Sequence, residues 1–274
     1  MALLRVVDGG DTAPDDDEAF VAHIVEALAS ISGMEAIHLG GSRGNGRAHP
    51  SSDWDLGVYF RGPIDHSAIE AVAKAQGWDG EVFPAGAWGP VMNGGAWLRI
   101  DGRKVDLLWR DLDAIDRLLD EAEQGQFEVF RIPFYLTGIP SYVPLAELSA
   151  GTVLWGDLPF TAMPPLLRRT AARWWADTAR LELAYAEKEA QRGSVVTCLG
   201  MLVRVLLDVA HATLATEGRW PTNEKRMIED ADLAHYADAL GHGGTSAEEL
   251  RELVAVVGRA TERLSTSGPS TTKG

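Results

Sequence analysis

A glycine-rich turn is the first stretch of this sequence whose residue types suit chemistry. An apolar run at 36–39 opens into Gly-Gly-Ser-Arg-Gly-Asn-Gly at 40–46, the pattern of a strand entering a tight loop. Such a loop leaves backbone N–H groups unshielded by side chains, and a helix beginning there adds the positive end of its dipole. The loop can therefore hold phosphate groups, and the Ser42 hydroxyl can add a hydrogen bond.

Three carboxylates complete the pattern. Asp53 and Asp55 follow the loop, and strand periodicity places both on one face while Trp54 points to the other. Asp106 lies inside a later apolar strand, where a buried charge is costly unless something compensates it. If the two strands are neighbours, the three carboxylates converge on a site suited to two Mg²⁺ ions.

Each of these elements also has an ordinary structural interpretation. The glycine loop alone is typical of a simple turn, and Asp53 could be a cap or turn residue after Ser51 and Ser52. Asp106 could occupy the exposed side of an edge strand. The order and spacing of all three elements together favour the catalytic interpretation.

The joint arrangement closely resembles the nucleotidyltransferase domain of the DNA polymerase β superfamily. That family has an apolar residue before Gly-Gly or Gly-Ser, a short gap, Asp-x-Asp or Asp-x-Glu, and a third acidic residue on a later strand. The matching residues are Leu39, Gly41, Ser42, Asp53, Asp55 and Asp106. The resemblance covers residues 18 to about 125.

The resemblance implies Mg²⁺-dependent transfer of a nucleoside monophosphate from a nucleoside triphosphate, with ATP favoured, to a hydroxyl, with release of pyrophosphate. The Gly41 backbone and Ser42 would hold the β- and γ-phosphates. Asp53 and Asp55 would coordinate both metal ions, and Asp106 would hold the ion that activates the acceptor hydroxyl.

The helical half that follows is also the layout of the small-molecule antibiotic nucleotidyltransferases, such as the aminoglycoside and lincosamide enzymes. The resemblance therefore implies a small hydroxylated acceptor, with an aminoglycoside-like antibiotic favoured. In related enzymes a lysine after the turn between bundle helices reaches the nucleotide phosphates, and Lys225 is the candidate here, with a surface lysine as the alternative.

Two arginines near the glycine loop are further candidates. A guanidinium of Arg43 or Arg47 could meet the triphosphate, and Arg43 is favoured because it directly follows Ser42. A solvated loop arginine is the alternative for both.

An alternative function rests on Arg204 and His211, which are separated by six residues in one apolar helix. That spacing permits the arginine-histidine pair of the HEPN ribonucleases, which often partner nucleotidyltransferases in toxin-antitoxin systems. The alternative is then a nucleotidyltransferase acting on a protein, with a HEPN-like helical half. Packing of the histidine between helices is the competing interpretation.

A possible acceptor pocket is suggested by the pair Trp174 and Trp175, with Glu182 and Glu187 further along the same helix. Adjacent aromatic residues more often belong to a core. The sequence does not single out a general base.

The elements that position these residues predict an α+β fold. A mixed β-sheet catalytic domain is expected first, with a helix after the acidic run at 15–18, a helix at 64–76, and a hairpin turning at Asp101-Gly102. A helical bundle is expected to follow, with helices at 166–191, 194–216 and 247–264 and another after Pro221-Thr222. The predicted segments are a flexible leader at 1–17, the catalytic domain at 18–125, a connecting region at 126–164, the bundle at 165–264 and a disordered tail at 265–274.

Composition restricts the partners. The 25 Lys and Arg residues against 40 Asp and Glu give a formal net charge of -15, which disfavours nucleic acid and favours a cationic small molecule. Because the N-terminus carries only Arg5 before its acidic run and no membrane-spanning segment is expected, a cytoplasmic location is predicted. The one cysteine, Cys198, allows no internal disulfide and is expected to be buried. The sequence does not indicate an oligomeric state.

Overall fold

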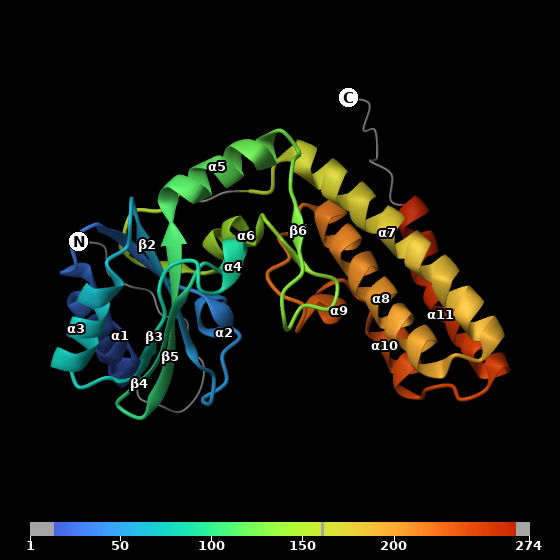
Figure 1. The fold of residues 1–274 in the computed structure, drawn as a ribbon, viewed down its shortest axis with the longest axis horizontal. Helices are drawn as coiled ribbons and strands as arrows, with labels where there is room; N and C mark the ends of the chain where they lie inside the picture. Colours follow the sequence, from blue (N-terminus) through green and yellow to red (C-terminus); the bar gives the residue numbers. More distant parts are fainter. Residues whose placement is uncertain (1–13, 160–161, 267–274) are drawn as a thin grey trace. The chain divides into compact units, whose positions relative to one another are not determined.

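The structure is a computed structural model of the 274-residue chain, and it describes residues 14–159 and 162–266. These residues form two compact units (Figure 1). The first unit contains residues 14–120 and 144–159, and the second contains residues 121–143 and 162–266. Most of the predicted leader and of the predicted disordered tail, at 1–13 and 267–274, lies outside the described residues.

A mixed six-stranded sheet of order β3-β4-β5-β2-β1-β8 forms the centre of the first unit. Strands β2 and β5 run parallel, and the other neighbouring pairs run antiparallel. The bounds are β1 (Met34–Leu39), β2 (Trp54–Phe60), β3 (Asp79–Val82), β4 (Gly95–Ile100), β5 (Arg103–Asp111) and β8 (Thr152–Gly156). The edge strand β8 comes from the predicted connecting region, whose residues are thus divided between the two units.

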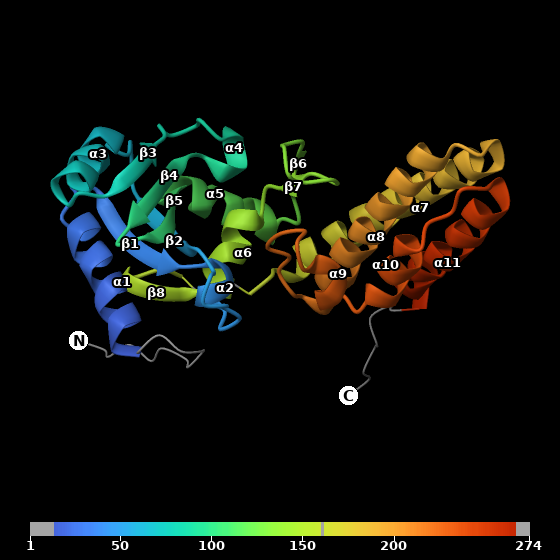
Figure 2. The same cartoon turned by 90° about the horizontal axis from the view of Figure 1, so that it is seen from below.

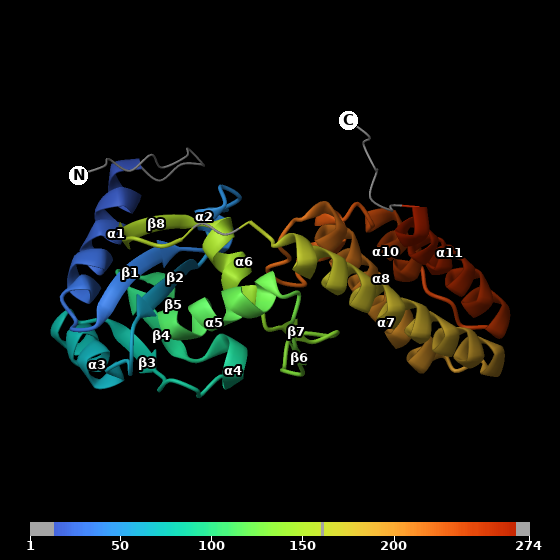
Figure 3. The same ribbon diagram turned by 90° about the horizontal axis from the view of Figure 1, so that it is seen from above.

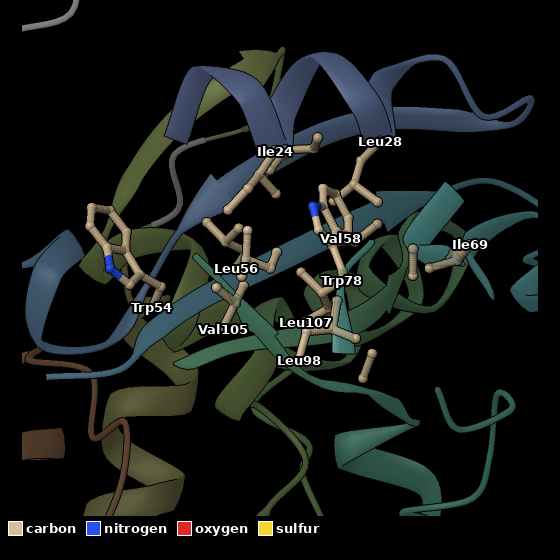
Figure 4. Close-up of a cluster of buried hydrophobic side chains, with 14 of the residues drawn as sticks. Ile24, Leu28, Trp54, Leu56, Val58, Ile69, Trp78, Leu98, Val105 and Leu107 are labelled. Carbon is tan, nitrogen blue, oxygen red and sulfur yellow. The ribbon is translucent and has the colours of Figure 1, made fainter. Parts of the chain in front are cut away.

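Helices of this part of the chain are α1 (Pro14–Ala29), α2 (Gly41–Gly44), α3 (His66–Ala75), α4 (Gly89–Met92), α5 (Leu112–Glu123) and α6 (Val143–Ala150). Figure 3 shows α1 beside β1 and β8. In the core drawn in Figure 4, Ile24 and Leu28 of α1 and Ile69 of α3 pack with Leu56 and Leu107 of the sheet. Each fully buried aliphatic side chain contributes roughly 1.5–3 kcal/mol, so this layer fixes one face of the sheet.

The hairpin between β4 and β5 turns at Asp101 and Gly102, as predicted. Both residues have positive φ, 49° and 77°. Such angles define the tight turn whose twist matches that of the flanking strands. The turn thereby sets the register that brings β4 residues opposite Asp106.

The second unit is a helical bundle, which confirms the predicted α+β class. Its helices are α7 (Pro165–Arg192), α8 (Val195–Glu217), α9 (Met227–Asp230), α10 (Ala234–Gly241) and α11 (Ala247–Thr266), with the short strands β6 (Val129–Phe130) and β7 (Ile139–Pro140). Figure 2 shows α7, α8 and α11 running side by side. Buried Cys198, as expected, lies in their shared core.

Helix α8 corrects the expectation that no segment could span a membrane. Among the described residues it is the one helix whose length and apolar composition would allow a membrane crossing. Many of its apolar side chains, Leu202 and Val209 among them, are fully buried in the bundle core, whereas Val196 and Val203 are exposed. The hydropathy of α8 is therefore that of a central helix in a bundle.

Candidate functional site

Alternation along the strands gives the sheet of the first unit two faces. Leu56 of β2 and Leu107 of β5 point into the core, so Asp55 and Asp106 point to the opposite face. In the parallel register of β2 and β5, Asp55 pairs with Asp106. The two carboxylates that the sequence assigns to different strands are therefore direct neighbours on one face.

The glycine turn folds directly against Asp55. The Gly40 N–H donates to the Asp55 carbonyl oxygen at 2.8 Å, and the Gly44 N–H donates to the Gly40 carbonyl at 2.8 Å. Gly41 has a φ of +57°, and a Cβ added there would lie only 1.8 Å from Asp55 Oδ2. Glycine is therefore required at 41, because any side chain would displace the carboxylate that the loop contacts.

Asp53 precedes β2 and is partly exposed. Its side chain is 44% exposed, and its Oδ1 lies 3.9 Å from Lys104 Nζ. At this exposure the ion pair contributes about 1 kcal/mol or less. Asp53 is therefore free of strand pairing and can reorient without disturbing the sheet.

The donor set of Asp53, Asp55 and Asp106 fits Mg²⁺ chemically, since it offers only carboxylate oxygens. Within 14–159 and 162–266, no three or more His, Cys, Asp or Glu side chains gather into a ready-made metal site. Mg²⁺ commonly takes one or two protein carboxylates and completes its shell with substrate phosphates and water. The neighbouring Asp55 and Asp106, beside a loop that exposes its backbone, match that requirement.

Arg43 is directed back into the first unit. Its guanidinium donates to the Ser52 carbonyl at 3.1 Å, pairs with Asp17 at 3.3 Å and lies 4.1 Å from the centroid of the Trp54 ring. These contacts hold the glycine loop against α1 and the start of β2. Contact of Arg43 with a nucleotide stays a prediction.

Asp16 and Asp17 correct the predicted leader, because α1 already begins at Pro14. Asp17 also pairs with Arg103 at 2.8 Å, and Asp16 pairs with the same guanidinium. A proline followed by acidic residues is typical of a first helical turn, since proline suits its geometry and carboxylates suit the dipole. This signal could have placed the helix start correctly, whereas the contact of Asp17 with Arg43 of the glycine loop is known only from the structure.

A buried polar layer, missed by sequence reasoning, fixes α6 over the same face of the sheet. Arg110 of β5 is 2% exposed, pairs with Glu147 of α6 at 2.6 Å and donates to the Met92 carbonyl at 3.1 Å. Nearby His38 of β1 is buried, and its burial, with the Arg110 charge, lowers its pKa to about 4. His38 is therefore neutral near pH 7.

Lys225 lies in the second unit. It is exposed in the turn before α9, and its backbone N–H donates to Asn223 Oδ1 at 3.0 Å. The preceding Glu224 accepts hydrogen bonds from the backbone N–H and hydroxyl of Thr137, both at 2.9 Å, which fix the turn. A phosphate contact by Lys225 stays a prediction.

The structure contradicts an RNA-cleaving pair of Arg204 and His211. His211 is 2% exposed and stacks on Trp175, with ring centroids 3.9 Å apart and an interplanar angle of 7°. Arg204 pairs with Glu182 and donates to the Leu136 carbonyl at 2.7 Å. The imidazole is therefore a core group that an RNA chain cannot reach.

His211→Phe is expected to stabilise the second unit. Both ring nitrogens of His211 lack a hydrogen-bond partner among the described residues, and a phenyl ring preserves the stack on Trp175. We expect a gain of about 1 kcal/mol or more at pH 7.5. Urea denaturation of both proteins measures the gain.

The stability gain of His211→Phe should increase as the pH falls. Burial lowers the pKa of His211 to about 3 from 6.5, so the unfolded chain binds more protons between these values. The wild type therefore loses stability as pH falls from 6.5 toward 3, whereas the variant lacks this loss. If the stability gain of His211→Phe at pH 5 did not exceed the gain at pH 7.5, the lowered pKa of His211 would be contradicted.

The two adjacent tryptophans of α7 have different environments. Trp175 is fully buried, and its Nε1 donates to the Tyr142 hydroxyl at 3.0 Å. Trp174 is 42% exposed and, with residues 127–130, lines a cavity of about 430 Å³. Trp175 thus belongs to the core, and only Trp174 is placed to meet a ligand.

A family model matches the part of the chain that carries this site. Residues 21–124 match the family model described as "Nucleotidyltransferase domain". No curated protein matches the chain in sequence. The matched segment contains the glycine turn, Asp53, Asp55 and Asp106.

Three solved structures show distant similarity. A nucleotidyltransferase-like protein from Exiguobacterium sibiricum 255-15 has 13% identity and a TM-score of 0.46, with 92% of this chain and 77% of that chain covered. The spectinomycin adenyltransferase AAD(9) from Enterococcus faecalis, solved with ATP and spectinomycin, has 13% identity and a TM-score of 0.31 over 92% and 99% of the two chains. A cyclic dinucleotide synthase, CdnE, from Elizabethkingia meningoseptica, solved with GTP and Apcpp, has 11% identity and a TM-score of 0.26 over 90% and 91%.

The sequence match covers the strands β2 and β5 that carry the acidic residues and the turn that packs against them. The fold around them is the mixed sheet that the sequence predicts. The chain therefore contains a nucleotidyltransferase domain at residues 21–124 and is an enzyme of the class that transfers phosphorus-containing groups.

Proposed function

We propose that this protein is a Mg²⁺-dependent nucleotidyltransferase that moves AMP from ATP to a hydroxyl of a small molecule and releases pyrophosphate. An aminoglycoside-like antibiotic is the acceptor that we favour. The observation that carries the proposal is the register of Asp55 beside Asp106, with Gly41 packed against the Asp55 carboxylate.

The proposed roles follow from this placement. Asp53, Asp55 and Asp106 would hold two Mg²⁺ ions, and the Gly41 backbone with Ser42 would bind the β- and γ-phosphates. When bound, such ions lower the pKa of an acceptor hydroxyl and neutralise charge on the triphosphate. Arg43 and Lys225 are kept as candidate phosphate contacts.

In the proposed reaction the acceptor oxygen forms a bond to the α-phosphorus of ATP. The bond from that phosphorus to the oxygen bridging the α- and β-phosphates breaks, and pyrophosphate leaves with that electron pair. The proton of the acceptor hydroxyl passes to solvent water. Positioning of the triphosphate by the loop backbone would supply much of the rate, because orienting two bound reactants removes an entropic cost.

Charge supports a small cationic acceptor over a polynucleotide. The chain carries a net charge of -15, which repels phosphate backbones and attracts amines. A cytoplasmic location fits such a reaction, because ATP is the proposed donor. A protein acceptor, from the toxin-antitoxin alternative, is retained only as an outcome of the test, since His211 is buried.

The test is incubation of the full chain with each nucleoside triphosphate, Mg²⁺ and separate panels of aminoglycosides, lincosamides and protein extracts. Mass spectrometry then identifies any product that has gained a nucleoside monophosphate. We expect an AMP adduct on an aminoglycoside, absent with Asp106→Asn. Adducts on protein alone would replace the small-molecule proposal, and no adduct in any panel would contradict it.

A further inference from the structure

We propose that Trp97, flanked by Glu81 and Asp106, binds an amine-bearing ring of the acceptor, such as an amino sugar or aminocyclitol. The inference rests on the proposed function, because it places the acceptor beside Asp106. It adds a residue, Trp97, that determines specificity for the amine-bearing ring.

Strand register places these residues in one row across the sheet. Glu81 of β3 pairs with Trp97 of β4, Trp97 pairs with Asp106 of β5, and Asp106 pairs with Asp55 of β2. Directly paired residues point to the same face of a sheet, with Cβ atoms about 5 Å apart. The indole therefore lies between two carboxylates on the face that carries the candidate metal ligands.

Trp97 is unusually exposed for a tryptophan in a sheet. The residue is 54% exposed, whereas its strand neighbours Ala96 and Leu98 are buried in the core. Trp88 stacks on its ring at a centroid distance of 5.2 Å and an interplanar angle of 21°, and Phe83 contacts it edge-on at 4.8 Å. Trp88 and Phe83 thus pack against the indole, yet more than half of the surface of the residue stays accessible to a ligand.

The surroundings fix Trp97 in place before any ligand arrives. A Cβ added to Gly95 would lie 2.6 Å from the Trp88 ring, so glycine there lets Trp88 pack closely. The loop that carries Trp88 is held by hydrogen bonds from Gly86 N–H to Asn93 Oδ1 at 2.8 Å and from Phe83 N–H to the Gly95 carbonyl at 2.8 Å. A preformed aromatic surface binds with little ordering cost.

An indole between carboxylates suits an organic cation. Ammonium groups are attracted to the face of an aromatic ring, with tryptophan the strongest of the aromatic residues, and a nearby carboxylate adds ion pairing. The C–H groups of a sugar or cyclitol ring also pack on an indole face. A phosphate-rich ligand that brings no Mg²⁺ is disfavoured here by the charges of Glu81 and Asp106.

The nearest basic residues of the same face, Arg99 and Lys104, lie one row away and have their own partners. Arg99 lies opposite Lys104 in the strand register of β4 and β5, and Arg99 Nη1 donates to the Gly102 carbonyl at 3.0 Å. Lys104 Nζ lies 3.9 Å from Asp53 Oδ1. These cations are therefore oriented toward the hairpin turn and Asp53.

The test is isothermal titration of the full chain with kanamycin and, as a neutral control of the same skeleton, fully N-acetylated kanamycin. We expect the wild type to bind only the amine form. Trp97→Ala should weaken this binding at least about 10-fold, about 1.4 kcal/mol, Trp97→Phe should restore most of it, and Glu81→Gln should weaken it about 3-fold. Tyr185→Ala is the matched control, because Tyr185 is a similarly exposed aromatic residue, at 50%, on α7 of the second unit.

The outcomes separate this inference from the proposed function. Titration with MgATP on the same proteins should give equal affinities for the wild type and Trp97→Ala. Loss of kanamycin binding in Tyr185→Ala instead of Trp97→Ala, binding of the acetylated form, or no binding by the wild type would overturn the inference. Weaker MgATP binding by Trp97→Ala would overturn it as well, by assigning Trp97 to the nucleotide. If the wild type binds no MgATP at all, the proposed function itself fails.

Discussion

Asp55→Asn is expected to lower the rate of nucleotidyl transfer by about 1,000-fold or more, with the fold intact. The amide has the size of the carboxylate, so its packing against Gly41 is retained while its negative charge is lost. Electrostatic groups aimed at charge in a transition state commonly contribute this much, and a metal ligand acts through the same charge. Steady-state pyrophosphate release with the acceptor identified by the mass-spectrometric screen measures the effect.

Asp79→Asn is the matched control for this charge removal. Asp79 lies on the edge strand β3, is exposed, and pairs in register with Arg99 on the same face of the sheet. It should keep transfer within about 2-fold of the wild type, since the charge of an exposed surface residue contributes little. Transfer by Asp55→Asn at wild-type rates, with an unchanged melting temperature, would show that Asp55 does not take part in the reaction.

Gly41→Ala is expected to reduce transfer at least about 100-fold, because the added methyl overlaps Asp55 Oδ2 at 1.8 Å. Either the loop or the carboxylate must move, and a displacement of about 1 Å at a reacting centre typically costs this factor. The free energy of unfolding of the variant should also fall by about 1 kcal/mol, because a non-glycine residue is strained at a φ of +57°. Kinetic assays and urea denaturation separate the two effects.

Gly46→Ala isolates the backbone cost. Gly46 has a φ of +71° in the same loop, but a Cβ there meets nothing within 4 Å. It should therefore lose a similar stability of about 1 kcal/mol and keep most of the transfer activity. Equal activity losses in the two variants would show that loop strain, and not contact with Asp55, explains the effect of Gly41→Ala.

Much of the fold follows from local signals in the sequence. Asp101-Gly102 fixes the β4–β5 hairpin because both positions need positive φ, and Gly193 and Gly218 end α7 and α8 in the left-handed conformation. Asp65, however, caps α3 with its side chain, so that helix begins at His66, after the predicted start. Long periodic helices and tight turns are thus the predictable part, and the ends of short helices are not.

The candidate site depends on pairings between distant strands, which a single sequence does not specify. Asp55 and Asp106 were expected to converge only if their strands were neighbours, and the parallel β2–β5 register supplies that condition. The row from Glu81 through Trp97 to Asp106 could not be anticipated, because β3 is a four-residue strand with two acidic residues and a glycine. Sequence identified the chemistry of the residues, and long-range pairing determined which of them are neighbours.

Ionic contacts between residues far apart in the sequence are a second feature that sequence did not reveal. Asp16 and Asp17 look like a solvated acidic run, yet they pair with Arg103, and Asp17 also pairs with Arg43. Arg110 of β5 and Glu147 of α6 are 37 residues apart in the sequence and form an ion pair where α6 packs on the sheet. Charge runs predict surface exposure well, but the partners of a charge depend on the three-dimensional fold.

The most direct test of the site is binding of Mn²⁺, in place of Mg²⁺, followed by electron paramagnetic resonance with and without a non-hydrolysable ATP analogue. The wild type and Asp79→Asn should bind Mn²⁺ more tightly when the analogue is present, because metal and triphosphate share one site. Asp106→Asn should weaken that binding at least about 10-fold. Binding of Mn²⁺ and the analogue by Asp106→Asn with wild-type affinity would contradict a site built on Asp55 and Asp106.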